Sequence, residues 1–304
     1  MVGQWRHNYS EEEIVCMERD FWYDLLLYVL VPLEYIFLFM FLFHITHHQL
    51  STLEYIGNVA AMGILSGTIG INVAHELGHR TGRWDRFLAK ALLLTTTYMH
   101  FYIEHNRGHH KRVSTEEDPA SARFNEPVYT FLLRTITFSF LSAWKLEAER
   151  MLRLKLSRWN IRNLALQFVL IQVAFLAVIY LLFGTGGVLG FVISSLIGIV
   201  LLEIVNYIQH CGLERKHTAN GTYEQVQPNH SWNSGYPIGQ ILLFQLGRHS
   251  DHHFKASKKY QILEYRSESP QMPTGYTGMI VMALVPLIWF RVMNPLVKKY
   301  KKND

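Results

Sequence analysis

Histidines gather in four short clusters along this chain, and their spacing points to metal chemistry. The 304 residues include 16 histidines, and nine of them fall within 75–79, 104–110, 206–213 and 246–253. Imidazoles at positions i and i+4 share one face of an α-helix, where both can bind one ion. Neutral imidazole is also the commonest side-chain ligand of redox-active transition metals. The candidate ligands are His75, His79, His105, His109, His110, His210, His249, His252 and His253.

The number of candidate ligands indicates two metals. A structural zinc site uses four ligands, whereas nine suit two metals with coordination positions left open. Carboxylates beside ligating histidines commonly orient the imidazole rings. Four acids in or near the clusters are candidates for that role: Glu76, Glu104, Asp118 and Asp251. The alternative is that they are solvated acids or ion-pair partners of nearby arginines.

Other interpretations of the histidines remain open at this point. The HELGH motif at 75–79 also matches a zinc protease, in which the glutamate is the general base, but that leaves six histidines without a role. A metal transporter or sensor predicts histidines along a path through the membrane, which the clusters do not follow. Outside the clusters, His44 lies in a loop predicted to be across the membrane from the site, and His100 has no partner spacing. We expect them to be hydrogen-bonded or solvated.

The elements that position these clusters are predicted to be membrane helices. The chain is 49% hydrophobic and 17% charged, against about 25% charged for a soluble domain. A span needs about 20 mostly apolar residues. Glu34 and Glu203 lie within the first and last predicted spans, and we expect both to face the bundle interior because an acid at that depth is costly. The predicted spans are 25–43, 53–74, 164–183 and 188–207.

The distribution of basic residues predicts the orientation. The links at 44–52 and 184–187 contain no Lys or Arg, whereas the stretches after the second and fourth spans are strongly basic. The positive-inside rule places these basic stretches, and the histidines with them, in the cytoplasm. We expect the shorter apolar stretches at 87–103, 128–144 and 277–290 to lie against the membrane or to pack on the metal domain.

These features predict an all-α integral membrane protein with about four transmembrane helices and a cytoplasmic, histidine-rich di-metal domain. Residues 1–24 are expected to form a cytoplasmic N-terminal segment, and residues 25–304 the membrane-bound domain. The two cysteines, Cys16 and Cys211, form no CxxC pair, which argues against a zinc finger or an iron–sulfur centre. A net charge of +5 would suit nucleic acid, but the apolar segments favour a membrane and no nucleic acid.

Longer motifs surround the clusters. The histidine boxes are HELGHR (75–80), EHNRGHH (104–110), NYIQHCGL (206–213) and LGRHSDHH (246–253). Further matching stretches are EEDPASAR (116–123), YEQVQPNHSWNS (223–234), SPQMPTGY (269–276) and LVPLIWFRVMNP (284–295). Together they resemble the integral-membrane non-haem di-iron alkane 1-monooxygenases, within the fatty acid desaturase and hydroxylase superfamily. The resemblance covers roughly residues 20–297, and the fourth box with its flanks separates this family from the desaturases.

The resemblance implies two irons that activate O2 and hydroxylate the terminal methyl of an n-alkane to a 1-alkanol. The second oxygen atom leaves as water, with two electrons from rubredoxin, which an NAD(P)H-dependent rubredoxin reductase reduces. The nine histidines match the family's ligand positions. The expected location is the bacterial inner membrane, with the site on the cytoplasmic side. The sequence agrees on an outside electron donor, because it contains no dinucleotide fingerprint and no cysteine cluster.

Two features depart from the family's pattern. The fourth box usually has Glu before the histidine and Tyr after it, and here these are Gln209 and Cys211. Relatives usually carry six spans, and this chain begins just before what resembles their third. Two alternatives therefore stay open: a related di-iron hydroxylase or desaturase acting on alkyl-aromatic or fatty acyl substrates, and an inactive truncated homologue.

Overall fold

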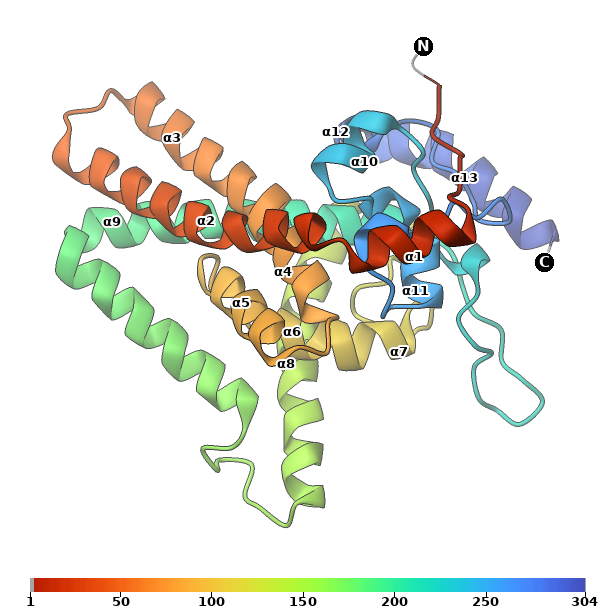
Figure 1. Cartoon of the computed structure of the whole chain (residues 1–304), viewed down its shortest axis with the longest axis horizontal. Coiled ribbons are helices and arrows are strands. Elements are labelled where there is room, and N and C mark those ends of the chain that lie inside the picture. The colour runs from red at the N-terminus through yellow and green to blue at the C-terminus, as the bar shows by residue number, and fades with distance from the viewer. Residues whose placement is uncertain (1–2, 304) are drawn as a thin grey trace. The chain divides into compact units, whose positions relative to one another are not determined.

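The computed structural model describes residues 3–303 and is built from helices (Figure 1). Two isolated β-bridges, His217 with Tyr223 and Asn233 with Gln271, are the other regular pairings among these residues. The all-α fold class is therefore confirmed. The chain divides into two compact units. The first comprises the described residues up to Asp20, Gly108–Phe138 and those from Glu203 onward, and the second comprises Phe21–Arg107 and Ser139–Leu202.

The second unit holds the long apolar helices. Its core is formed by side chains such as Leu38, Phe41 and Met62, which pack with Ile179 and Phe191. Two helices continue from one unit into the other along the chain, α8 (Val128–Arg153) and α9 (Leu164–His210). The remaining helices of this unit are α2 (Phe21–His47), α3 (Thr52–Leu65), the π-helix η1 (Ser66–Gly70), α4 (Ile71–Gly78), α5 (Arg83–Leu94) and α6 (Phe101–Glu104).

Three helical segments are long and apolar enough to cross a membrane, or four if a bent pair near the C-terminus counts as one span. They are Phe21–His47, Thr52–Gly78 and Leu164–His210. The first matches the predicted span 25–43. The second matches the predicted span 53–74, and it continues through η1 and α4 to the first histidine box. This number of candidate spans agrees with an integral membrane protein.

Helix α9 covers both of the last two predicted spans. Its backbone leaves the helical conformation at Gly184, where φ is 64° and ψ is −167°. Positive φ is open to glycine because glycine has no Cβ. Figure 1 shows the ribbon of α9 changing direction between its two limbs. The predicted turn at 184–187 is therefore a sharp kink at its first residue.

Glycines bring α3 and η1 close to α9 within the second unit. A Cβ added to Gly67 would lie 2.9 Å from the Cα and the carbonyl oxygen of Gly198. A Cβ added to Gly63 would lie 2.6 Å from the Cβ of Ile197. Small residues at such positions let membrane helices pack backbone to backbone. This packing fixes the span that leads into His75.

The two acids inside the spans are buried, with 2% of Glu34 and 1% of Glu203 exposed. Glu34 accepts a hydrogen bond from the Ser66 hydroxyl at 2.7 Å. Glu203 accepts one from the Thr135 hydroxyl at 2.8 Å. Both acids therefore face protein and not lipid, as the cost of an ionisable group in the membrane predicts.

The first unit contains most of the histidine boxes and the N-terminal residues. The guanidinium of Arg248, in the last box, donates to the carbonyl oxygen of His7 at 2.8 Å. The side-chain amide of Asn8 makes two hydrogen bonds with the backbone of Tyr265: its Nδ2 donates to the carbonyl oxygen at 3.0 Å, and its Oδ1 accepts from the N–H at 2.6 Å. The helices of this unit are α1 (Glu11–Arg19), α7 (His110–Arg112), η3 (Pro228–His230), α10 (Pro237–Leu242), η4 (Leu246–Arg248), α11 (His249–Phe254), η5 (Tyr260–Ile262), α12 (Tyr276–Ala283) and α13 (Pro286–Asn303).

Candidate metal centre

Three of the predicted ligands come together in the second unit. His75 lies on α4, His79 caps its C-terminus, and His105 follows α6. The Nε2 atoms of His79 and His105 are 3.0 Å apart. The ring of His75 lies 4.5 Å from that of His105 and 4.8 Å from that of His79, measured between centroids. Helix α4 therefore presents its i and i+4 imidazoles to one point, as its spacing predicts.

Four further predicted ligands form a buried cluster in the first unit. One ring nitrogen from each of them lies within 4.8 Å of the others. The Nε2 of His249 is 3.1 Å from that of His210 and 3.0 Å from that of His253. The ring of His109 is 4.9 Å from those of His210 and His253. At most 5% of any of these four residues is exposed.

The last two predicted ligands pair with each other in the same unit. The Nε2 atoms of His110 and His252 are 3.2 Å apart, and their ring centroids are 4.9 Å apart. His252 is buried, whereas His110 is partly exposed. The structure therefore gives each of the nine predicted histidines at least one other predicted histidine as a neighbour.

These distances fit a metal bound between the rings. A metal–imidazole bond of about 2.0–2.1 Å puts neighbouring nitrogens about 3 Å apart at right angles. The measured separations around His249 are 3.0 and 3.1 Å. A ring nitrogen lone pair accepts one good hydrogen bond, so a single proton cannot satisfy both of these contacts at once. A cation between the rings can satisfy both.

Electrostatics also favours ligand-competent imidazoles. Burial first, and then the neighbouring rings of His110 and His249, hold the pKa of His253 well below its ordinary value. His253 is therefore neutral near pH 7, and only a neutral imidazole has a lone pair for a metal. The buried ring of His253 can therefore offer this lone pair to a metal cation.

Asp118 directly contacts a candidate ligand. Its Oδ2 accepts from the Nδ1 of His109 at 2.8 Å and from the Ser121 hydroxyl at 2.6 Å. Burial raises the pKa of Asp118, but the His109 ring and the Ser121 hydroxyl outweigh it, so the pKa lies below its ordinary value. An ionised acceptor on Nδ1 leaves Nε2 of His109 facing the cluster.

Two of the other predicted acids pair with basic residues. Asp251 is fully buried and accepts hydrogen bonds from Lys258 at 2.9 Å and from Arg266 at 2.7 Å. Glu76 pairs with Arg80 at 3.4 Å. Glu104 is 2% exposed. Asp251 and Glu76 therefore pair with basic residues, and these ion pairs hold the segments on which the histidines lie.

Comparison with known proteins identifies the family. The fatty acid desaturase family model matches residues 55–282. Alkane 1-monooxygenase 1 of Alcanivorax borkumensis is 38% identical over all of this chain and 75% of its own length. Alkane 1-monooxygenase of Ectopseudomonas oleovorans is 39% identical over all of this chain and 76% of its own length. Alkane 1-monooxygenase 2 of Pseudomonas aeruginosa is 43% identical over 82% of this chain and 66% of its own length. The chain belongs to the alkane 1-monooxygenase family.

The predicted resemblance is thereby confirmed. Members of the alkane 1-monooxygenase family named above are oxidoreductases, and the buried histidine clusters of this chain are capable of binding metal, as is typical of the di-iron desaturase superfamily. Function within a fold family depends on the residues of the site. In this chain, the histidines of the clusters come from the same four boxes that carry the resemblance.

One detail of this alkane 1-monooxygenase site differs from the expectation. His105 and His109 were expected to share a helix face. They lie instead at the two ends of a π-helix, η2 (His105–His109), in which the hydrogen bonds run from i to i+5. His105 faces His79 in the second unit, and His109 faces His210 in the first.

His100 was expected to be hydrogen-bonded or solvated. It is 8% exposed, and its Nε2 has no hydrogen-bond partner within residues 3–303. Its ring packs edge-on against Tyr98 and Phe140, with centroids 4.3 and 5.2 Å away. Burial lowers its pKa to about 4, so it is a neutral, apolar-packed histidine.

Sequence reasoning assigned no role to several residues that support the site. Trp232 is fully buried. Its backbone N–H donates to the carbonyl oxygen of Gln209 at 2.8 Å, and its indole Nε1 donates to that of Cys211 at 3.0 Å. Both residues next to His210 are therefore held by one residue, through its backbone and its side chain. The matching stretch at 223–234 was the available signal.

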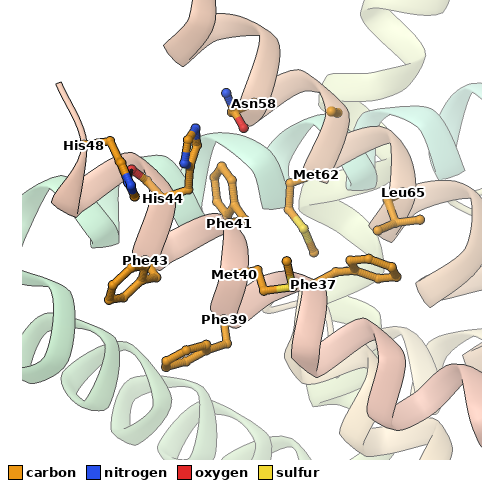
Figure 2. A pocket seen from close by; sticks show the side chains of 11 residues that line it. Phe37, Phe39, Met40, Phe41, Phe43, His44, His48, Asn58, Met62 and Leu65 are labelled. Carbon is orange, nitrogen blue, oxygen red and sulfur yellow. Dashed lines mark hydrogen bonds between the residues drawn. The ribbon is translucent and has the colours of Figure 1, made fainter. Parts of the chain in front are cut away.

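Two pockets lie in the second unit. One of about 480 Å³ is lined by polar residues that include His79, Arg80, Arg86 and Arg107. The other, of about 470 Å³, lies between α2 and α3 and is lined mainly by Phe, Met and Leu side chains. Figure 2 shows His44, His48 and Asn58 at one end of it and Leu65 with Phe37 at the other.

Proposed function

We propose that this chain is an alkane 1-monooxygenase that hydroxylates the terminal methyl of n-alkanes with O2 and electrons from reduced rubredoxin. The observation that carries the proposal is the convergence of the buried nitrogens of His109, His210, His249 and His253 within 4.8 Å of one another. The family membership supplies the reaction class. The alignment of the whole chain with about three quarters of the length of relatives at 38–39% identity favours alkane hydroxylation over the alternatives.

The nine histidines are proposed to hold two irons. His75, His79 and His105 hold one, the four-histidine cluster holds the other, and His110 and His252 supply the remaining nitrogens of the pair. Bound there, the irons would supply O2 activation, by which one oxygen atom would enter a C–H bond and the other would leave as water with two electrons from rubredoxin and two protons. The protein's part is to keep the histidines neutral and oriented, with Asp118 fixing the ring of His109 through its Nδ1.

The apolar pocket between α2 and α3 supports an alkane as substrate. An n-alkane offers no hydrogen-bonding group, so its position must be set by the shape of an apolar site. The lining includes Phe37, Met40, Met62 and Leu65. Leu65 precedes His75 on the same continuous span by ten residues, about 15 Å of helical rise. A chain held along this span is aimed at the histidines of α4.

The polar pocket beside His79 supports delivery of electrons by an acidic protein. Arg80, Arg86 and Arg107 line it, and His79 itself forms part of its wall. Opposite charges steer partners together and fix their register. We propose that rubredoxin docks over this pocket, on the side of the membrane that the basic residues assign to the cytoplasm of a bacterium.

The test is a joint measurement of metal content and turnover. The chain would be purified in detergent, and its iron and zinc would be quantified. It would then be incubated with octane or hexadecane, O2, rubredoxin, rubredoxin reductase and NADH. About two irons per chain and formation of 1-alkanol that depends on rubredoxin are the expected results. Iron without product from either alkane would contradict the substrate, and no iron after anaerobic loading would contradict the site.

A matched pair of variants controls for loss of a histidine as such. His253→Ala removes a fully buried ring from the four-histidine cluster, whereas His217→Ala removes an exposed one. His253→Ala is expected to lose iron and product formation, and His217→Ala is expected to keep both. Equal iron content and turnover in the two variants would contradict the assignment of His253.

A further inference from the structure

The residue before His210 takes part in a short hydrogen-bond chain within the first unit. Gln209 is 1% exposed and Tyr276 is 5% exposed. The Nε2 of Gln209 donates to the hydroxyl of Tyr276 at 2.8 Å. That hydroxyl in turn donates to the carbonyl oxygen of Leu246 at 3.2 Å. Three segments that are distant in sequence are thereby joined through two side chains.

The donor-to-acceptor direction of these two hydrogen bonds is fixed by the last acceptor. A backbone carbonyl oxygen can only accept, and a phenol has a single proton, so the Tyr276 hydroxyl directs its proton to Leu246. The phenol oxygen must then accept from position 209. A glutamine amide has two N–H donors, whereas an ionised glutamate has none. The network therefore calls for an amide at 209, and this accounts for Gln209 in physical terms.

These hydrogen bonds join the backbone segments that carry the facing imidazoles of His210 and His249. Gln209 directly precedes His210 at the end of α9, and Leu246 begins the 3-10 turn η4 that leads into His249. The Nε2 atoms of His210 and His249 are 3.1 Å apart. Trp232 binds the carbonyl oxygens of both residues next to His210, so the backbone that carries this ring is held on each side.

We propose that Tyr276 and Gln209 are positioning residues that set the separation of His210 and His249, and that hydrogen-bond direction selects an amide at 209. The inference rests on the proposed role of these histidines as metal ligands. It adds a requirement that the ligands alone do not impose. Groups that orient metal ligands typically change metal affinity about 10–100-fold when they are lost.

The experiment compares the rate at which a chelator removes metal from purified, metal-loaded chains. Tyr276→Phe deletes the hydroxyl, Gln209→Met deletes the amide at similar size, and Gln209→Glu reverses the preferred direction. The matched control is Tyr236→Phe, because the Tyr236 hydroxyl also donates to a carbonyl oxygen, that of Pro273 at 2.9 Å. Mössbauer spectra of the iron-loaded variants report whether the ligand geometry changes.

Tyr276→Phe and Gln209→Met are each expected to release metal about 10-fold faster than the unaltered chain. Gln209→Glu is expected to release it faster still, and each of the three to show altered Mössbauer parameters. Tyr236→Phe is expected to match the unaltered chain in both measurements. Because Tyr276 and Gln209 act through one hydrogen bond, the double variant Gln209→Met/Tyr276→Phe is expected to release metal little faster than either single variant.

Release from Tyr276→Phe at the unaltered rate would overturn the positioning role. Release from Gln209→Glu no faster than from Gln209→Met would overturn the selection of an amide. If the unaltered chain holds zinc and no iron, the proposed function fails while the release rates still test the positioning. A chain that holds no metal overturns both.

Discussion

Replacing Asp118 by Asn tests whether the carboxylate beside His109 stabilises bound metal. Asp118 is 1% exposed. Its Oδ2 accepts from His109 and Ser121, and its Oδ1 accepts from the backbone N–H of Ala120 at 3.1 Å. Asn keeps one oxygen. If that oxygen faces His109 and Ser121, the amide nitrogen meets the N–H of Ala120 donor to donor. In the other orientation, both side-chain donors lose their acceptor.

The magnitude follows from these contacts. Leaving a buried donor unsatisfied costs about 1–3 kcal/mol, and about 1.4 kcal/mol corresponds to a tenfold change in an equilibrium constant at 25 °C. The negative charge next to a metal-bound imidazole is lost as well. We therefore expect the metal affinity of Asp118→Asn to fall about 10–100-fold, which agrees with the usual effect of groups behind a ligating histidine.

The assay is competition with a chelator of known affinity, followed by measurement of the metal left on the purified chain. Glu117→Gln is the matched control, because it removes the same charge from an exposed neighbour. Affinity in Asp118→Asn within twofold of the control would refute the reasoning. It would mean that the His109 ring is held by its surroundings and not by the carboxylate.

Three further predictions concern the fold, each measured as thermal unfolding in detergent. Glu147→Gln is expected to lower the free energy of unfolding by about 2–3 kcal/mol, because Glu147 is fully buried between two arginines and the N-terminus of α9. A loss of stability equal to that of exposed Glu149→Gln would contradict this. Gly67→Ala is expected to cost about 1–3 kcal/mol because its Cβ would meet the backbone of α9, whereas Gly57→Ala, with open space around it, is expected to cost nothing; equal midpoints would disprove the close packing. The pKa of His100, about 4, lies below its ordinary value of 6.5, so its stabilising contribution is present above pH 6.5 and lost as pH falls toward 4. From pH 7 to 5 this amounts to about 2 kcal/mol, and His100→Leu should show a pH dependence smaller by that amount; an unchanged pH dependence would argue against burial of a neutral ring.

The helices were predictable because membrane helices are specified by length and composition. The predicted span 25–43 lies inside α2, which extends to Phe21 and His47 and contains Pro32. The predicted span 53–74 lies inside a longer segment that continues to Gly78. Hydropathy falls where α4 begins to carry polar ligands, although the helix does not end there. Apolar content therefore located the spans but placed their ends too early.

Spacing along the chain identified the histidines that cluster, but it did not show which histidine belongs to which group. The i and i+4 rule assumes α-helical pitch, which α4 has around His75 and which η2 does not have between His105 and His109. A π-helix has no established sequence signal of its own here. The sequence therefore could not predict that the second box directs His105 and His109 to different groups of histidines. The partner of Gln209 was equally hidden, because Tyr276 reaches it only through the folded loop.

The arrangement of the histidines along the chain also bears on how the protein is made. His110 and His252 face each other across a sequence separation of 142 residues. At roughly 5–20 residues per second, a ribosome releases the first of them about 7–28 s before the second. Until the last box is synthesised, the proposed ligands are held by open loops whose closure costs entropy. The apolar spans α2 and α3 are complete long before that. Insertion of these two spans is therefore expected to precede closure of the histidine clusters.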